Sequence, residues 1–463
     1  MKKVKAVLNK FFKIEERGST ITNEIVGGII IFLAMFYILP VNSFMVGGSG
    51  IEGASVGGVF FATAVAAAVA TLIMGLLANF PVALAPGMGV NAFFTYTVCK
   101  TLGYSYPQAL VCVLISGVLF LIISVTNLRQ LVLKAIPKNL KYAIGAGIGF
   151  FITFIGFKNA GIIVPDASTQ TTLGNLANPT VLLAVFGIVL VLVLHNVSLK
   201  TRRFAVIISL FATALLGVLL GVCGVPNMPT LNGGSLSDGS DFFTGVGAFV
   251  KGFDVLAKPE TYAVIFSFLF VDFFDTAGTL VAVGTEANLV DEGGNLVEDK
   301  KALLADSIGT VVGAALGTPT VTSYIESTTG IASGARTGLS ATVTGVLFLL
   351  SLLIYPALGM FGSVMIDGVS YSPVTSLALV YVGTLMFGQV KEIDWKDTIA
   401  VASTFLVLIL MLLCNSISDG IVFGVISYVL MMLAARRYKQ VHPIMYALSV
   451  LFVVYLVVKF TAL

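Results

Sequence analysis

Charged residues are scarce in this chain. Only 11% of its 463 residues are Asp, Glu, Lys or Arg, whereas 57% are hydrophobic. Soluble domains carry about a quarter charged residues, so the composition excludes a soluble fold and predicts an all-α protein that crosses a membrane many times. The net charge of +3 is too small to attract nucleic acid, and we expect no such partner.

Histidine and cysteine are scarce as well. The chain has 2 histidines and 4 cysteines, and no group of them has the spacing of metal ligands. We expect Cys99, Cys112, Cys223 and Cys414 to be small buried apolar residues. The sequence therefore predicts no metal, no cofactor other than a coupling ion and no enzymatic activity.

Long apolar runs occupy most of the chain. We predict about fourteen transmembrane spans, several of them shorter than the roughly 20 residues that cross a bilayer in a straight helix. The first seven are Ile25–Val46, Val56–Leu77, Val82–Val98, Ala109–Val125, Ala143–Phe157, Val181–Leu194 and Phe204–Val222. The second seven are Tyr262–Gly284, Leu303–Leu316, Thr320–Ile331, Leu339–Met360, Val374–Val390, Thr398–Leu413 and Asp419–Ala434.

Basic residues alternate between the predicted connections. Arg129 and Lys134 are in the fourth connection and Lys200 in the sixth, whereas the connection after Met360 has no Lys or Arg. Positively charged connections stay on the cytoplasmic side. We therefore expect a multi-pass protein of the plasma (inner) membrane with a cytoplasmic N-terminus, an outer Gly224–Glu260 connection and a cytoplasmic Thr285–Lys301 connection.

The third and tenth predicted spans are interrupted. The third contains Pro81 and Pro86, and the tenth contains Pro319 before a β-branched, hydroxyl-rich segment. Proline removes a helical hydrogen bond, and broken backbone at membrane depth must be buried in protein or line a cavity. Paired interruptions in two halves indicate a transporter's binding site. An odd number of spans in each half, about seven, predicts a 7+7 inverted repeat.

Four polar residues lie at membrane depth near these interruptions. Asp272 and Asp275 share one face of the eighth span, Asn91 follows the first break and Glu326 follows the second. An Asp at the centre of a span costs roughly 2.5 to 3.5 kcal/mol on insertion. Two carboxylates without a basic partner cannot comfortably both stay ionised there, so one should hold a proton near neutral pH.

Each of these residues also has a structural interpretation. Asn91 can cap the half-helix that follows it, and Glu326 can neutralise a helix N-terminus. Asp272 and Asp275 can pair with basic residues, although none lies inside a predicted span. Thr276 can bond to the preceding helical turn. We favour a functional role for the carboxylates because nothing else in the sequence offsets their cost.

Three motifs resemble one transporter family. NFPVALAPGMGVNAFFTYTV, FVDFFDTAGTL and TPTVTSYIESTTGIASGARTG closely resemble the AzgA-like hypoxanthine/guanine/adenine permeases of the nucleobase–cation (nucleobase–ascorbate) symporters. The resemblance implies proton-coupled import of purine bases by alternating access. It also implies a core domain and a gate domain, with substrate between the eighth span and the two broken spans, each of which begins as a short extended segment.

The resemblance assigns roles to particular residues. It implies that Asp272, Glu326 and Asn91 bind substrate and that Asp275 is linked to the proton. Secondary contacts come from four further residues, Thr276, Phe94, Met88 and Ser323. One departure is Val41-Asn42-Ser43, where the family usually has Asn-Pro, and it puts any role of Asn42 in doubt.

The resemblance also divides the chain. We expect a cytoplasmic amphipathic leader in 1–23, which either touches membrane lipid or is solvated. The core domain is expected to comprise 24–127 and 261–363, and the gate domain 128–224 and 364–435. An outer connection in 225–260 and a C-terminal segment in 436–463 complete the chain. The apolar stretch 446–461 within that last segment stays unassigned. An apolar gate surface favours a homodimer through the gate domains.

Two other classes of protein fit parts of the pattern. An anion transporter or channel of the same 7+7 fold would use half-helix N-termini, but Asp272, Asp275 and Glu326 would repel its substrate. A membrane-embedded enzyme would use the carboxylates as acid and base or as metal ligands, but no histidine lies near them in sequence. Uptake of labelled base by proteoliposomes, with and without a proton gradient, separates the three classes.

Overall fold

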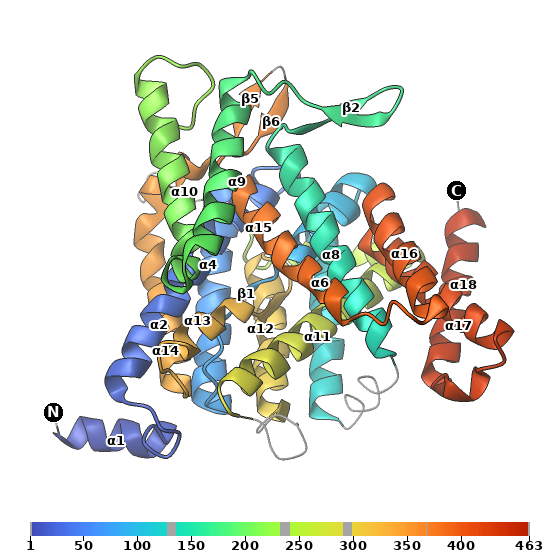
Figure 1. The fold of residues 1–463 in the computed structure, drawn as a ribbon, viewed down its shortest axis with the longest axis horizontal. Helices are drawn as coiled ribbons and strands as arrows, with labels where there is room; N and C mark the ends of the chain where they lie inside the picture. Colours follow the sequence, from blue (N-terminus) through green and yellow to red (C-terminus); the bar gives the residue numbers. More distant parts are fainter. Residues whose placement is uncertain (1, 127–135, 232–240, 290–298, 367, 462–463) are drawn as a thin grey trace.

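Membrane-length helices make up most of the fold (Figure 1). The computed structural model describes residues 2–126, 136–231, 241–289, 299–366 and 368–461. Within these residues, 9 helices are long and apolar enough to cross a membrane, and they correspond to nine of the predicted spans. The other five predicted spans are interrupted, short or, in the case of α12 (Asp299–Leu316), polar at one end, so none of them forms a helix that is both long and apolar enough to cross a membrane.

The helices and strands follow the chain in this order. Before residue 232 they are α1 Lys2–Phe12, α2 Ile21–Met35, α3 Ile38–Asn42, η1 Ser43–Gly47, α4 Val56–Ile73, η2 Met74–Ala78, β1 Leu84–Pro86, α5 Met88–Ala92, η3 Phe93–Thr101, α6 Tyr106–Val125, α8 Lys138–Asn159, β2 Ile163–Asp166, β3 Gln170–Leu173, α9 Pro179–Val197 and α10 Leu199–Val222. After residue 240 they are η4 Ala248–Lys251, η5 Phe253–Ala257, α11 Glu260–Glu286, α12 Asp299–Leu316, β4 Val321–Ser323, η6 Ile325–Ser327, α13 Thr328–Ile331, α14 Gly338–Leu350, η7 Ser351–Phe361, β5 Val364–Ile366, β6 Val369–Tyr371, α15 Ser376–Phe387, η8 Gly388–Glu392, α16 Thr398–Leu413, α17 Ile417–Ala434, η9 Tyr438–Gln440 and α18 Pro443–Thr461.

The helices pack in two groups. The first helix group contains α2, α4, α6, α11, α12 and α14, and the second contains α8, α9, α10, α15, α16 and α17. Helices of one group contact each other far more than they contact the other group. The groups meet where α2 touches α10 and α11 touches α17, and the short segments α5 and η7 add contacts to α8 and α10. A seam between two packed bodies therefore runs through the molecule.

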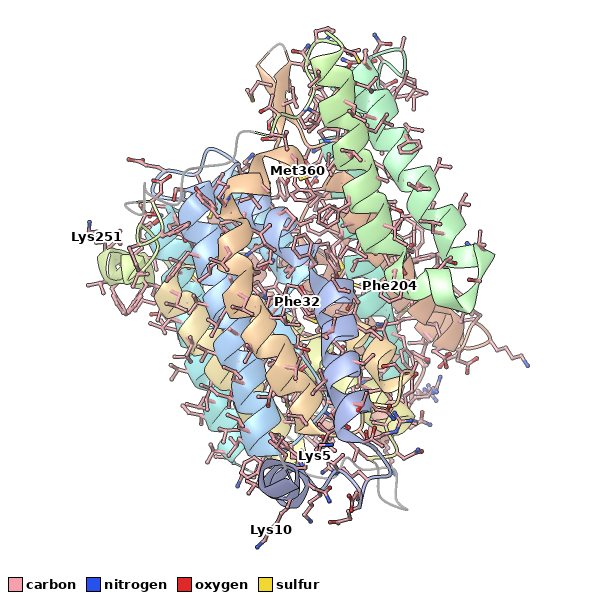
Figure 2. All side chains as sticks on the ribbon, turned by 90° about the vertical axis from the view of Figure 1, so that its left-hand side faces the viewer. Lys5, Lys10, Phe32, Phe204, Lys251 and Met360 are labelled. Carbon is pink, nitrogen blue, oxygen red and sulfur yellow. The ribbon has the colours of Figure 1, made fainter. Side chains whose placement is uncertain are left out.

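The two ends of the molecule differ. Helix α1, with Lys5 and Lys10, lies at one end, and Met360 lies near the other (Figure 2). The hairpins β2–β3 and β5–β6 lie at this second end (Figure 1). We call them the α1 end and the hairpin end. Residues 127–135, 232–240 and 290–298, which hold parts of three predicted connections, are outside the described residues.

Two sequence expectations are resolved in the fold. Cys99 and Cys112 are buried, but Cys223 and Cys414 are exposed, so the expectation that all four are buried was wrong. Each of the exposed pair caps the C-terminus of a helix, where the chain leaves the packed interior. The unassigned apolar stretch forms α18, which packs against α17 and α11 and places Phe452 edge-on to Phe266.

A buried glutamate fixes the start of α14. The carboxylate of Glu24 is fully buried and accepts hydrogen bonds from the backbone N–H groups of Arg336 at 2.7 Å, Thr337 at 3.2 Å and Ser340 at 3.3 Å. N–H groups at the start of a helix lack the carbonyl partner four residues earlier, and among the described residues only that of Ser340 has a further backbone acceptor, the Thr337 carbonyl at 3.3 Å. One side chain on α2 thereby joins the first helix of the first helix group to its last.

Glu24→Ala is expected to destabilise the fold. It leaves buried N–H groups without an acceptor, which costs about 2 to 3 kcal/mol. Thermal unfolding of detergent-purified Glu24→Ala should therefore begin at a lower temperature than that of the parent. Glu24→Gln keeps one acceptor oxygen, so its unfolding temperature should lie between those of Glu24→Ala and the parent. Equal melting curves for all three proteins would contradict this account of Glu24.

Candidate functional site

The two predicted interruptions meet inside the first helix group. Strands β1 and β4 are antiparallel, with Leu84 opposite Ser323 and Pro86 opposite Val321, and β1 lies among the helices rather than at either end (Figure 1). Two further backbone hydrogen bonds extend the pair, Gly87 N to Thr320 O and Tyr324 N to Ala83 O, both 3.0 Å. Each broken segment thus provides hydrogen-bond partners for backbone N–H and C=O groups of the other. Such groups must be paired where the surroundings are apolar.

Glu326 follows this strand pair directly. Its Oε1 accepts a hydrogen bond of 2.7 Å from the hydroxyl of Tyr37, a buried residue between α2 and α3. Glu326 is itself partly exposed. Asp275 and Tyr324 are close enough to interact with it electrostatically. The Tyr37 hydroxyl therefore holds Glu326 Oε1 in place, while part of the residue is accessible to solvent.

Asp272 and Asp275 have different partners although both lie on α11. Asp272 is 1% exposed; its Oδ2 lies 2.9 Å from the hydroxyl of Thr310 on α12, and its Oδ1 has no hydrogen-bond partner among the described residues. Asp275 is partly exposed and lies 3.5 Å from the hydroxyl of Thr322 on β4, on the side of Glu326. One carboxylate is thus buried against α12 and the other faces the strand pair.

A further carboxylate, Asp306, belongs to this site and was missed in the sequence. It is a fully buried residue of α12; its Oδ1 accepts a 3.1 Å hydrogen bond from the Ser323 hydroxyl, and its Oδ2 has no partner among the described residues. Asp306 is close enough to Asp272 to interact with it electrostatically. The signal was present, because Asp306 is an acidic residue inside the predicted span Leu303–Leu316.

Asn91 is a further buried polar residue with unpaired side-chain atoms. It lies in α5 directly after β1, is fully buried, and neither its amide nitrogen nor its oxygen has a hydrogen-bond partner among the described residues. It does not cap α5, whose first residue follows Gly87. Buried polar atoms are almost always paired in native proteins. Unpaired buried atoms also occur on six other described residues, Asn42, Thr95, Ser209, Thr213, Thr320 and Thr404. Those of Asn91, Asp272 and Asp306 belong to residues in or next to the broken segments around the β1–β4 pair, where a polar ligand would complete them.

The four predicted secondary contacts occupy two kinds of environment. The Thr276 hydroxyl bonds that of Thr322 at 2.8 Å, and Ser323 bonds Asp306, so both belong to the polar site. Met88 is buried, and Phe94 packs edge-on against Tyr106 and beside Phe268. The hydroxyls are thus part of the polar network, whereas Phe94 is held in an aromatic cluster.

Asn42 lies at the edge of the polar network. Its Nδ2 donates to the hydroxyl oxygens of Thr63 at 2.8 Å and Thr318 at 2.9 Å, which joins α3, α4 and the segment before β4. The sequence departure around Asn42 therefore coincides with a residue that positions the second broken segment.

The site is acidic, and no ion pair among the described residues links a basic side chain to its carboxylates. Neither of the two ion pairs recorded in the described chain involves Asp272, Asp275, Asp306 or Glu326. In the part of the chain that the structure describes, no group of three or more His, Cys, Asp or Glu residues is arranged to hold a metal ion. Carboxylate, amide and hydroxyl groups in this arrangement can accept hydrogen bonds from a neutral polar ring and can exchange protons.

Comparisons with known proteins point to one family. A family model described as "Permease family" matches residues 22–423. The guanine/hypoxanthine permease PbuG of Bacillus subtilis (strain 168) is 41% identical over 97% of this chain and 99% of its own length. The adenine permease AdeP of Escherichia coli (strain K12) is 35% identical over 97% and 96%.

Solved structures show the same fold at low sequence identity. The transmembrane domain of the cyanobacterial bicarbonate transporter BicA is 14% identical, with a TM-score of 0.62 over 87% of this chain and 97% of that one. SLC26A9 is 11% identical, with a TM-score of 0.60 over 94% of this chain and 69% of that one. These likenesses concern the architecture alone.

Proposed function

This chain belongs to the permease family that includes these purine permeases, and from that premise we propose that it imports adenine, guanine and hypoxanthine by proton symport. It is a permease and not an enzyme. The observation that carries the proposal is the set of buried, unpartnered polar atoms on Asn91, Asp272 and Asp306 around the β1–β4 pair.

The ligand chemistry fits a purine. A purine is flat and neutral, with ring N–H donors and lone-pair acceptors on its edge. Asp272 Oδ1 and Glu326 accept from ring N–H groups, and the Asn91 amide both donates and accepts. In this proposal the four hydroxyl and apolar contacts, Thr276, Ser323, Met88 and Phe94, complete the shape of the site.

Asp275 is proposed as the proton-linked group. It lies beside Glu326, and two neighbouring carboxylates in a low-dielectric site are unfavourable when both are ionised. A proton taken up by one of them would favour purine binding at the other, and its release would favour opening to the opposite side. Asp306 extends the same network toward Asp272.

The wider architecture belongs to the proposal as well. We assign the first helix group to the core domain and the second to the gate domain, with about fourteen spans in a 7+7 inverted repeat and alternating access at their seam. The α1 end is assigned to the cytoplasm, where α1 would touch anionic lipid. The exposed apolar side chains of α9 and α10 favour a homodimer through the gate domains.

Uptake of labelled purines by proteoliposomes tests this function. An inward proton gradient should drive accumulation of adenine, guanine or hypoxanthine, and collapse of the gradient should remove it. Uptake of bicarbonate in place of purine would support an anion transporter, and absence of both would reject the proposal.

Glu326→Gln is expected to weaken purine binding by about tenfold or more, because a hydrogen bond to an ionised group is worth roughly 1.5 to 3 kcal/mol. Binding to the purified variant is measured by calorimetry, with the exposed Glu286→Gln as the control. Unchanged binding and uptake by Glu326→Gln would show that Glu326 is no ligand.

A further inference from the structure

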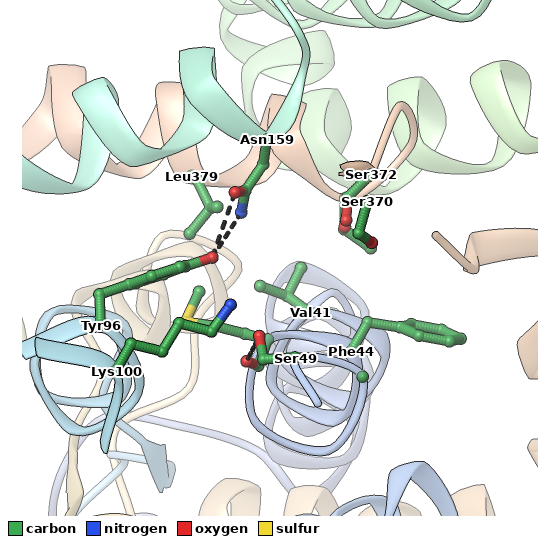
Figure 3. A pocket seen from close by; sticks show the side chains of 12 residues that line it. Val41, Phe44, Ser49, Tyr96, Lys100, Asn159, Ser370, Ser372 and Leu379 are labelled. Atoms are coloured by element: carbon green, nitrogen blue, oxygen red, sulfur yellow. Dashed lines mark hydrogen bonds between the residues drawn. The ribbon is translucent and has the colours of Figure 1, made fainter. Parts of the chain in front are cut away.

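A cavity lies at the hairpin end of the seam between the helix groups (Figure 3). Its volume is about 90 Å³, room for about six to nine waters and so for a small bicyclic ring. On the side of the first helix group, lining residues come from η1, from Ser49 just after it and from η3, which holds Lys100. The second helix group contributes Asn159, which ends α8, and the start of α15. The cavity is separate from the acidic site in the residues that line it.

Two of the lining residues, Tyr96 and Asn159, form a hydrogen bond across the seam. The Tyr96 hydroxyl and the Asn159 amide lie within 2.9 to 3.1 Å of each other (Figure 3). A second bond, from the Thr97 hydroxyl to the Asn415 carbonyl at 2.9 Å, joins η3 to the turn between α16 and α17. Two contacts beside the cavity thus join η3 to the second helix group.

One cationic side chain, Lys100, gives the cavity a positive charge. Of the twelve residues that line it in the described chain, Lys100 alone is charged. Its amine is turned toward the cavity (Figure 3) and lies 5.5 Å from the centre of the Tyr96 ring. Ser370, Ser372 and Thr375 add hydroxyl groups from the opposite wall. The cavity thus has the opposite charge to the acidic site.

We propose that this cavity is an outer docking site that selects oxopurines, such as guanine and hypoxanthine, over adenine before they reach the acidic site. The proposal rests on the proposed import of purines. An ammonium group has three donors and no acceptor. Oxopurines present two adjacent acceptors, O6 and N7, and lysine commonly binds this edge, whereas adenine presents an amino donor at the same position. Lys100 therefore attracts the first edge and disfavours the second.

Uptake kinetics of a Lys100→Met variant test the selection. The apparent KM for hypoxanthine should rise by about five- to tenfold while that for adenine stays the same or falls, and Lys100→Arg should retain the preference. The matched control is Lys158→Met, since Lys158 is a neighbouring lysine that is exposed like Lys100 but does not line the cavity. An equal change for both bases, no change, or the same effect from Lys158→Met would overturn the proposal.

A labelling experiment tests the site apart from transport. Ser370→Cys is introduced together with Cys223→Ser and Cys414→Ser, because Cys99 and Cys112 are buried, and Glu326→Gln disables the proposed central site. Hypoxanthine should slow modification of Cys by a membrane-impermeant thiol reagent, adenine should not, and Lys100→Met should remove the protection. Protection that requires an intact Glu326, or equal protection by bicarbonate, would overturn the docking site; failure of uptake by the parent protein would instead overturn the proposed function.

Discussion

Asp272→Ala is expected to abolish purine uptake while the protein remains folded and inserted. The loss follows if Asp272 Oδ1, a buried atom without a partner, accepts a hydrogen bond from the base. The fold should tolerate the change, because removing a carboxylate from membrane depth favours insertion. Thr310 would also keep a partner, since its hydroxyl lies 2.9 Å from the Val321 carbonyl as well.

Two measurements separate these effects. Purine binding and uptake are measured on purified Asp272→Ala, and thermal melting and size-exclusion behaviour report on its fold. Thr310→Ala is the matched control: it removes the hydrogen bond to Asp272 but leaves the carboxylate, and should retain much of the uptake. Normal transport by Asp272→Ala would mean that the carboxylate is structural.

Asp275→Asn is expected to uncouple transport from the proton. The amide imitates the protonated acid, so the variant should still bind purine and exchange it across the membrane. It should lose accumulation driven by a proton gradient, because the group no longer releases a proton. Asp275 lies beside Glu326 and is partly exposed, whereas Asp272 and Asp306 are buried. It is therefore better placed than those two to exchange protons with water.

Counterflow and gradient-driven uptake on the same proteoliposomes decide the role of Asp275. Counterflow that persists while accumulation disappears would support a coupling role. Survival of both would place the proton elsewhere, with Asp306 as the next carboxylate to replace. Loss of both together with binding would make Asp275 a ligand of the base.

The main features of the site could be predicted from the sequence because they violate the rules of a membrane helix. Pro86 and Pro319 break apolar runs, and strands β1 and β4 are found beside them. Asp272, Asp275 and Glu326 are costly at membrane depth, and the structure gathers them around that strand pair. A proline or a carboxylate inside an apolar run can be recognised from the sequence without knowledge of the fold.

Other features depend on contacts that no pattern in the sequence reports. The hydrogen bond from Tyr37 to Glu326 joins residues 289 positions apart, and the bond between Tyr96 and Asn159 depends on how two helix groups meet. Asp306 was overlooked because it lies near the start of its span, where an acidic residue is common. The lengths of several spans were also beyond prediction, since helix ends inside a protein are set by packing.

The pairing of β1 with β4 has a consequence for how the protein is made. Leu84 emerges from the ribosome long before Ser323, its partner in the strand pair, and the intervening polypeptide must be synthesised first. The Thr71 hydroxyl of α4 already bonds the N–H and C=O of Leu84, but during that interval the Ala83 carbonyl and the Gly87 N–H lack their partners Tyr324 N and Thr320 O. Unpaired backbone groups are costly at membrane depth, and contacts of such long sequence separation form late. The nascent first half would therefore need temporary shelter, from water retained in the insertion machinery or from a chaperone, until the second half arrives.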